Sequence, residues 1–197
     1  MLIIDGKATA ASIRSELAGE VARLSPKAGR KPGLTVILVG DDPASATYVR
    51  NKERACREVG IQSEVLRLPS TASQQELLTF IETLNGRDDV DGILLQLPLP
   101  AGLDSRPCLE RIAPDKDVDG FHIVNVGRLW VGDSAAVEPC TPKGFMAMLD
   151  ATGEDLKGKE AVVIGRSNIV GKPVAAMLLS RHCTVTVCHS RTKDLQD

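Results

Sequence analysis

One lysine lies in the middle of an otherwise apolar helix stripe, and it is the residue with the clearest potential for chemistry. Residues 43–60 are predicted to form a helix that is capped by Asp42, with Pro43 in the first turn and Gly60 just past the end. On a helical wheel, six side chains lie within about 60° of the line that runs along the helix through Lys52: Ser45, Tyr48, Val49, Ala55, Cys56 and Val59. A partly desolvated lysine has a lowered pKa, so its neutral amine could transfer a proton or orient water. The alternative is that the ammonium simply extends along the apolar surface into water.

Two polar residues are expected near this lysine. Tyr48 precedes Lys52 by one turn on the same face, and Gln96 interrupts the apolar run "ILLQLPLP". Because the carboxyl ends of parallel strands share one edge of a sheet, Gln96 is expected to hold the lysine or a ligand there. A core glutamine bonded to backbone groups is the alternative. The Tyr-x-x-x-Lys spacing also matches short-chain dehydrogenases, but those enzymes place their glycine-rich loop before this pair, whereas here it follows.

Three aspartates occupy the segment "PDKDVDGFH" (114–122) in the order of a calcium loop. Val126 stands where such a loop needs a bidentate Glu, and no helix pattern leads into the segment, so calcium is disfavoured and no metal site is predicted. Asp119 could instead accept hydrogen bonds from an amino-pyrimidine ring. Simple solvation of the three carboxylates is the alternative.

The segment "VVIGRSNIVGKPVA" (162–175) has the pattern of a strand, a short loop ending in Gly171, and a helix. This geometry can lay a phosphate on a helix N-terminus. The G-x5-G spacing that starts at Gly165 fits neither the common dinucleotide motif nor the P-loop, and tight turns alone would also explain both glycines.

The residues after the next strand indicate which dinucleotide would bind. A carboxylate at that position favours NAD, but this chain has "HSRT" (189–192), with Ser190 and Arg191 and no acid. Together with Arg166, these residues favour a ribose 2′-phosphate and therefore NADP.

The elements that must position these residues alternate along the chain. Apolar or alternating runs at 34–40, 61–68 and 91–100 predict strands, and a capping box at 73–76 predicts a helix between the last two. The order strand, helix, strand, helix, strand predicts a parallel sheet covered on both faces.

The second half of the chain predicts the start of another α/β domain. Thr141 and Pro142 are expected to cap a helix. A buried strand is expected at 159–165 and a further strand at 183–189, with a helix between them. We predict two three-layer α/β domains, residues 1–139 and 140–197, of which the second is an incomplete Rossmann-like NADP-binding domain. One βαβ unit has too few strands to be a stable domain alone.

Composition excludes several classes of protein. The chain has 197 residues, of which 43% are hydrophobic, and a net charge of -2, which gives no electrostatic reason to expect nucleic acid or an acidic membrane as the partner. No apolar run is long enough for a signal peptide or a membrane span. The five scattered cysteines are expected to be reduced thiols of a cytosolic protein: Cys56, Cys108, Cys140, Cys183 and Cys188.

Five motifs in order carry a resemblance to a known family. The stretches "YVRNK", "DGILLQLPLP", "PDKDVDGF", "EPCTPKG" and "GRSNIVGKPVA" resemble the bifunctional methylenetetrahydrofolate dehydrogenase/methenyltetrahydrofolate cyclohydrolases over essentially all 197 residues. This resemblance implies oxidation of 5,10-methylenetetrahydrofolate with NADP, followed by hydrolysis to 10-formyltetrahydrofolate, both in one cleft between two α/β domains. It also implies a cytoplasmic homodimer.

The resemblance also implies roles for individual residues. Lys52 would assist hydrolysis, Tyr48 would stack on the folate ring system, Gln96 would position the lysine, and Asp119 would hold the pterin. The NADP contacts would be Gly165, Arg166, Ser167 and Ser190. Members of the family continue beyond the last residue here, so we expect a fragment or a truncated form. The alternative function is a truncated, catalytically impaired folate-binding or dimerising module.

Overall fold

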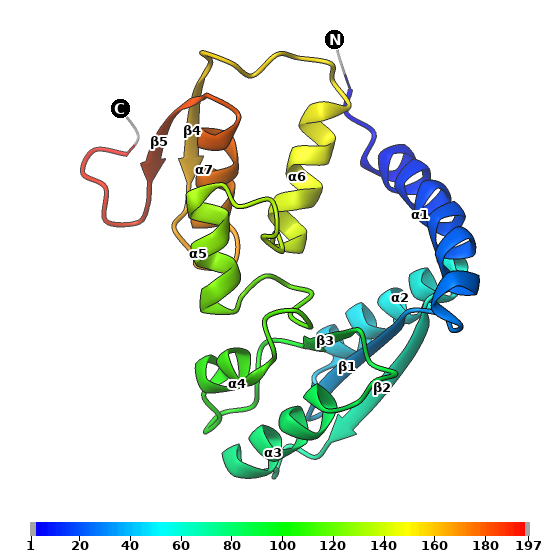
Figure 1. The fold of residues 1–197 in the computed structure, drawn as a ribbon. Coiled ribbons are helices and arrows are strands. Elements are labelled where there is room, and N and C mark those ends of the chain that lie inside the picture. Colours follow the sequence, from blue (N-terminus) through cyan, green and yellow to red (C-terminus); the bar gives the residue numbers. More distant parts are fainter. Residues whose placement is uncertain (1–2, 196–197) are drawn as a thin grey trace. The chain divides into compact units, whose positions relative to one another are not determined.

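The computed structural model describes residues 3–195, which divide into two compact units (Figure 1). The Lys52 unit comprises Ala10–Val118, and the Gly165 unit comprises residues 3–9 and 119–195. Helix α1 (Gly6–Ala28) contributes to both. This division falls at Val118, whereas the predicted boundary at residue 139 stays a prediction.

The Lys52 unit is built on a three-stranded parallel sheet in the order β2-β1-β3. The strands are β1 (Gly33–Val39), β2 (Gln62–Leu68) and β3 (Gly92–Leu95). Strands β1 and β2 lie within one residue of their predicted bounds, whereas β3 covers only the first part of the run predicted at 91–100. Leu34 of β1 is in register with both Ser63 of β2 and Gly92 of β3, so the carboxyl ends of the strands gather at one edge.

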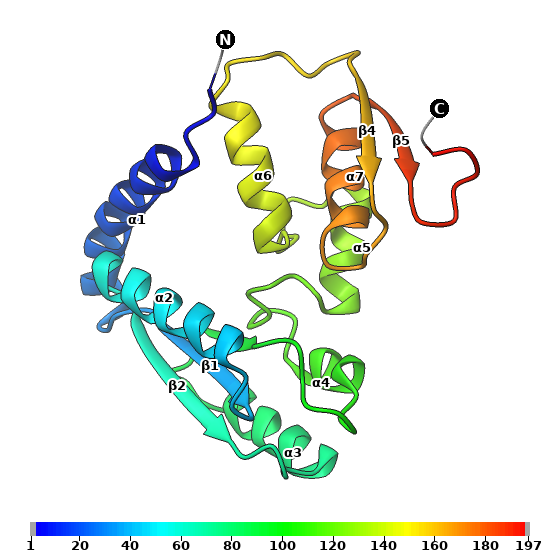
Figure 2. The same cartoon turned by 180° about the vertical axis from the view of Figure 1, so that it is seen from behind.

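Helices cover both faces of this sheet, as the alternating pattern predicts (Figures 1 and 2). Helix α2 (Pro43–Val59) packs on one face, where Val49 joins buried side chains of β1 and β3. Helices α3 (Gln74–Asn85) and α4 (Ser105–Arg111) pack on the other face, around a core that includes Leu77, Ile81 and Cys108. The unit therefore has three layers.

Besides the first turn of α1, the described residues of the Gly165 unit form a parallel pair of strands and three helices. The strands are β4 (Glu160–Ile164) and β5 (Thr184–Cys188), and α7 (Gly171–Ser180) connects them and packs against both. Helices α5 (Ile123–Val131) and α6 (Cys140–Asp150) pack on α7 in turn. The α/β class with parallel sheets is thus confirmed.

The structure corrects three expectations in this half of the chain. Strand β4 is not fully buried: Val162 and Ile164 are 65% and 75% exposed, because α7 covers only the other face of the strand pair. The cap of α6 is Pro139, which offers no side-chain acceptor, so Thr141 and Pro142 lie inside the helix. The looser stretch before residue 139 also holds two helices, α4 and α5, that the sequence pattern did not predict.

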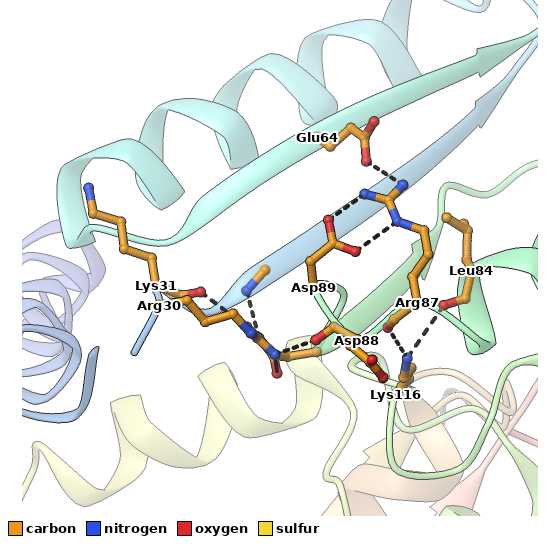
Figure 3. Close-up of polar contacts among 10 residues, drawn as sticks. Arg30, Lys31, Glu64, Leu84, Arg87, Asp88, Asp89 and Lys116 are labelled. Atoms are coloured by element: carbon orange, nitrogen blue, oxygen red, sulfur yellow. Dashed lines mark hydrogen bonds and ion pairs between the residues drawn. The ribbon is translucent and has the colours of Figure 1, made fainter. Parts of the chain in front are cut away.

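Ion pairs close the amino edge of the sheet in the Lys52 unit (Figure 3). Arg30 pairs with Asp91 at 2.6 Å, and Asp91 also accepts a hydrogen bond from the backbone of Gly33. Arg87 pairs with Asp89 at 2.8 Å and with Glu64 at 3.0 Å (Figure 3). This neighbouring guanidinium lowers the pKa of Asp89 to about 2.

Candidate functional site

Lys52 and Gln96 meet at the carboxyl edge of the sheet in the Lys52 unit. The Lys52 Nζ donates a hydrogen bond of 3.2 Å to Gln96 Oε1, and both side chains are half-buried. Gln96 follows β3 directly, and its backbone N–H donates to the carbonyl of Ile37 in β1. The Gln96 Nε2 donates to the carbonyl of Leu97 at 2.7 Å, which turns the amide oxygen toward the lysine. The predicted meeting of these two residues is therefore present in the structure.

The ends of α2 form as the sequence predicts, and this fixes Lys52 in the third turn. Asp42 Oδ2 accepts a 2.7 Å hydrogen bond from the backbone N–H of Ser45, and this bond lowers the pKa of the Asp42 carboxyl. Gly60 ends the helix with a φ of 85°, a left-handed conformation that favours glycine. Both caps hold the helix in one register relative to β1 and β2.

The buried side chains of α2 lie mostly on one side of the line that runs along the helix through Lys52. Ser45, Val49, Cys56 and Val59 are buried, but Tyr48 is 63% exposed, contrary to its place in the predicted buried stripe. A helix on a sheet buries only the arc that faces the strands, and Tyr48 lies beyond the edge of that arc. Lys52 sits at the boundary between the two sides.

Cys56 lies one turn after Lys52 and is a possible rival nucleophile. Burial raises the pKa of its thiol, so the group stays protonated near neutral pH. The thiolate is the reactive form of cysteine, and Lys52 is accordingly the better candidate for chemistry on this helix.

The segment that leads to Asp119 is fastened to the end of α3 by two side chains. Lys116 Nζ donates to the carbonyls of Asn85 and Arg87 at 2.8 and 2.7 Å (the Leu84 and Arg87 bonds are drawn in Figure 3). Asn85 accepts from the backbone N–H of Ala113 and donates to the carbonyl of Arg111. Two of these carbonyls, of Asn85 and Arg111, belong to the last residues of α3 and α4, where a helix leaves carbonyls without an intrahelical partner.

The same segment also joins the sheet. Asp117 is only 2% exposed and forms a parallel bridge with Ile93, whose N–H donates to the carbonyl of Lys116 at 2.7 Å. Sequence reasoning did not single out Asn85 or Lys116. The available signal was a polar residue at a helix end together with a lysine between two aspartates.

Asp119 is the first residue of the second segment of the Gly165 unit, 119–195, and is half-buried. Gly120 follows it with a φ of 67°, and a Cβ there would lie 2.3 Å from the carbonyl oxygen of Val137, so only glycine fits. Asp115, Asp117 and Asp119 form no cluster of metal ligands, and none occurs elsewhere among residues 3–195.

The glycine-rich loop of the Gly165 unit is a close-packed turn between β4 and α7. A Cβ on Gly171 would lie 2.4 Å from the carbonyl oxygen of Gly165, so the two backbones approach as only glycine allows. The Ser167 hydroxyl accepts hydrogen bonds from the N–H groups of Val170 and Gly171, at 3.1 and 3.2 Å. This capping role was not predicted, and a hydroxyl that accepts two bonds still has its own proton to donate to an anion.

The turn after β5 lies beside this loop. The N–H of Gly165 donates to the carbonyl of Cys188 at 2.7 Å, which continues the pairing of the two strands. Ser190 and Arg191 follow Cys188, and Arg166 follows Gly165, all with exposed side chains. The loop and the turn together carry two guanidinium groups and two hydroxyls beside the close contact of Gly165 with Gly171. This set of groups suits the phosphates of a dinucleotide.

Comparison with known proteins identifies the family. Residues 4–119 match the sequence model of the tetrahydrofolate dehydrogenase/cyclohydrolase catalytic domain. Residues 139–197 match that of the NAD(P)-binding domain of the same proteins. The chain belongs to the tetrahydrofolate dehydrogenase/cyclohydrolase family.

Relatives within this family are similar over the whole chain. The "Bifunctional protein FolD" of Oleidesulfovibrio alaskensis is 60% identical over 99% of the chain, which spans 69% of that protein. The corresponding protein of Moorella thermoacetica is 59% identical over 98% of the chain.

Solved structures of the family have the same fold. The bifunctional FolD enzyme of Campylobacter jejuni has a TM-score of 0.96 and 52% identity, covering 99% of this chain and 69% of that one. The FolD enzyme of Trypanosoma brucei, solved with NADP cofactor and an inhibitor, has a TM-score of 0.92 and 39% identity, covering 98% of this chain and 65% of that one. The dehydrogenase/cyclohydrolase family therefore accounts for both units.

Proposed function

We propose that this chain oxidises 5,10-methylenetetrahydrofolate to 5,10-methenyltetrahydrofolate with NADP and hydrolyses the product to 10-formyltetrahydrofolate. The observation that carries this proposal is the hydrogen bond between Lys52 and Gln96 in a chain of this family. The cofactor is NADP, in keeping with the NAD(P)-binding domain and with the relative solved with NADP.

Lys52 serves the hydrolytic step. The methenyl group is an electrophilic cation, so water needs only modest activation to attack its carbon. The neutral amine of Lys52 takes one proton from that water as the new C–O bond forms. The bond from the carbon to N5 then breaks with its electron pair going to N5, which gains a proton as the hydroxyl on the carbon loses its own, and the formyl group is left on N10. Gln96 holds the amine through its amide oxygen, which its own bond to the Leu97 carbonyl keeps facing the lysine.

Two further residues hold the folate. The phenol ring of Tyr48 is exposed one turn before Lys52, where it can stack on a flat ring system. The Asp119 carboxylate accepts hydrogen bonds from the amino-pyrimidine part of the pterin. A carboxylate matches those donors, and the neighbouring Gly120 fixes the backbone beside it.

The residues of the Gly165 unit hold NADP, which supplies a hydride acceptor to the first step. Gly165 permits the close approach of backbone to phosphate, and Ser167 donates its hydroxyl proton. Arg166 and Ser190 bind the ribose 2′-phosphate by charge and hydrogen bonding. These groups perform binding and orientation, which is the main requirement of hydride transfer.

We further propose that the protein works as a homodimer in the cytoplasm, without a nucleic-acid or membrane partner. The proposed boundary between its two domains is at residue 139. All five cysteines are free, which suits a reducing compartment. Within residues 3–195, no helix combines the length and apolarity needed to cross a bilayer. Light scattering at two concentrations measures the oligomeric state.

The function is tested by assaying both activities in Lys52→Met. We expect the hydrolysis rate to fall by about 10²-fold or more, because the proton acceptor is gone, while hydride transfer to NADP stays within about tenfold. Lys157→Met, at an exposed lysine of the other unit, is the matched control and should leave both rates unchanged. Equal hydrolysis rates in Lys52→Met and the parent would refute the role of Lys52.

A further inference from the structure

The turn after β5 is closed by hydrogen bonds of the His189 and Thr192 side chains. The N–H of His189 donates to Thr192 Oγ1 at 2.9 Å, and the N–H of Thr192 donates back to the His189 carbonyl at 2.8 Å. The N–H of Arg191 donates to His189 Nδ1 at 3.1 Å. His189 and Thr192 are both half-buried, whereas Ser190 and Arg191 between them are exposed. His189 and Thr192 therefore shape the turn, and Ser190 and Arg191 between them expose their side chains to solvent.

The imidazole of His189 acts here as an acceptor. Nδ1 receives the Arg191 N–H, so that nitrogen carries no proton and the ring proton lies on Nε2. This bond fixes the backbone of Arg191, from which the guanidinium extends. A side chain that accepts from a backbone N–H two residues later is a common way to set a tight turn.

The turn is fixed relative to the glycine-rich loop as well. Gly165 donates its N–H to the carbonyl of Cys188, the residue just before His189. Arg166 and Arg191 thus follow the ends of two paired strands, and neither segment, 165–170 or 189–193, contains a carboxylate. A phosphate monoester carries nearly two negative charges, whereas a ribose hydroxyl has none, so two guanidinium groups placed here discriminate strongly between them.

We infer that His189 and Thr192 are positioning residues for the choice of NADP over NAD: they touch no phosphate but hold Ser190 and Arg191 where a ribose 2′-phosphate is bound. This inference rests on the proposed function. The two residues should affect only the binding of the 2′-phosphate, because the hydrogen bonds made by His189 and Thr192 all lie within the turn after β5. Binding of the rest of the nucleotide depends on the loop that starts at Gly165.

The test compares two ligands that differ only in that phosphate. Calorimetry on the intact chain gives the affinities for 2′,5′-ADP and 5′-AMP, and their ratio measures discrimination. Thr192→Val removes the hydroxyl at nearly constant shape, and His189→Leu removes the acceptor. We expect each to lower the ratio about tenfold, with the affinity for 5′-AMP changed less than about twofold.

Conservative variants should restore the ratio. Asn at position 189 places an amide oxygen near the site of Nδ1, so His189→Asn should keep the discrimination of the parent, as should Thr192→Ser. Thr186→Val makes the same change as Thr192→Val at an exposed position of β5 and serves as the matched control.

The outcomes separate the inference from the function on which it rests. A parent chain without preference for 2′,5′-ADP refutes the proposed NADP site itself. A parent that discriminates, with His189→Leu and Thr192→Val retaining its ratio, overturns the inference alone. An equal loss of both ligands also overturns it, because that result indicates a merely structural role. Melting curves identify a variant that fails to fold, in which case the other position decides.

Discussion

Replacing Gln96 by Glu tests how the amide controls the neighbouring lysine. The Glu side chain has nearly the same shape but places a negative charge 3.2 Å from Lys52 Nζ. Two unit charges at that distance attract by about 1 kcal/mol in water and by about 5 kcal/mol at an effective dielectric constant of about 20. Because both side chains are half-exposed, the lower figure is the better guide. It corresponds to roughly tenfold less neutral amine.

We therefore expect Gln96→Glu to hydrolyse the methenyl substrate about tenfold more slowly near neutral pH. The assay follows the loss of the methenyl absorbance, corrected for spontaneous hydrolysis, across a pH series. Since higher pH restores the neutral amine, the deficit should shrink as the pH rises. The hydride-transfer rate should change less than the hydrolysis rate.

Gln96→Leu is the control for this experiment. It removes the hydrogen-bond acceptor without adding charge, so its deficit should not shrink with rising pH in the same way. If the Glu and Leu variants show the same loss and the same pH dependence, the charge argument is refuted.

The remaining predictions concern the glycine-rich loop and the amino edge of the sheet. Gly171→Ala would place a Cβ 2.4 Å from the Gly165 carbonyl oxygen and should weaken NADP binding at least about tenfold in a calorimetric titration. Gly144→Ala, in an open position of α6, should instead leave NADP binding unchanged and raise stability by about 0.5–1 kcal/mol in thermal melts. An NMR titration should give Asp89 a pKa of about 2. Arg87→Met should return the pKa of Asp89 toward about 4, because the guanidinium that lowers it is gone. In the parent the pair stabilises the fold above about pH 4, and this contribution is lost as the pH falls toward 2. An unchanged titration midpoint of Asp89 in the variant would exclude Arg87 as the cause.

The sequence predicts the elements with strong local signals. The capping box before α3, the Pro and Gly at the ends of α2, and the apolar runs of β1 and β3 all mark structure through neighbouring residues. Helix α1 was not predicted, although Ile13, Leu17, Val21 and Leu24 recur at helical spacing. Among the described residues of this helix only Val21 is buried. Helix α4 has only seven residues, and α5 carries Gly127 and several β-branched residues, which weakens any helical pattern.

The part of the candidate site that follows from sheet topology was predicted. The rule that parallel strands end at one edge was enough to bring Gln96 toward the helix that carries Lys52. The exposure of Tyr48 and the capping by Ser167 were not accessible, because they depend on the rotation of a helix and on the path of a loop. The closure of the last turn by His189 likewise follows from backbone geometry that no residue pattern encodes.

The ion pairs around Arg30 and Arg87 lie at the opposite end of the strands from Lys52, a span of about 20 Å for a seven-residue strand. The groups that reinforce the sheet are therefore not the groups proposed to act on substrate. Substitutions that change the stability of the sheet can therefore be made in the first set without touching the second, which separates robustness from activity in this unit. A library randomised at Arg30 and Arg87 should yield variants whose melting temperatures differ by a few degrees at nearly constant reaction rates.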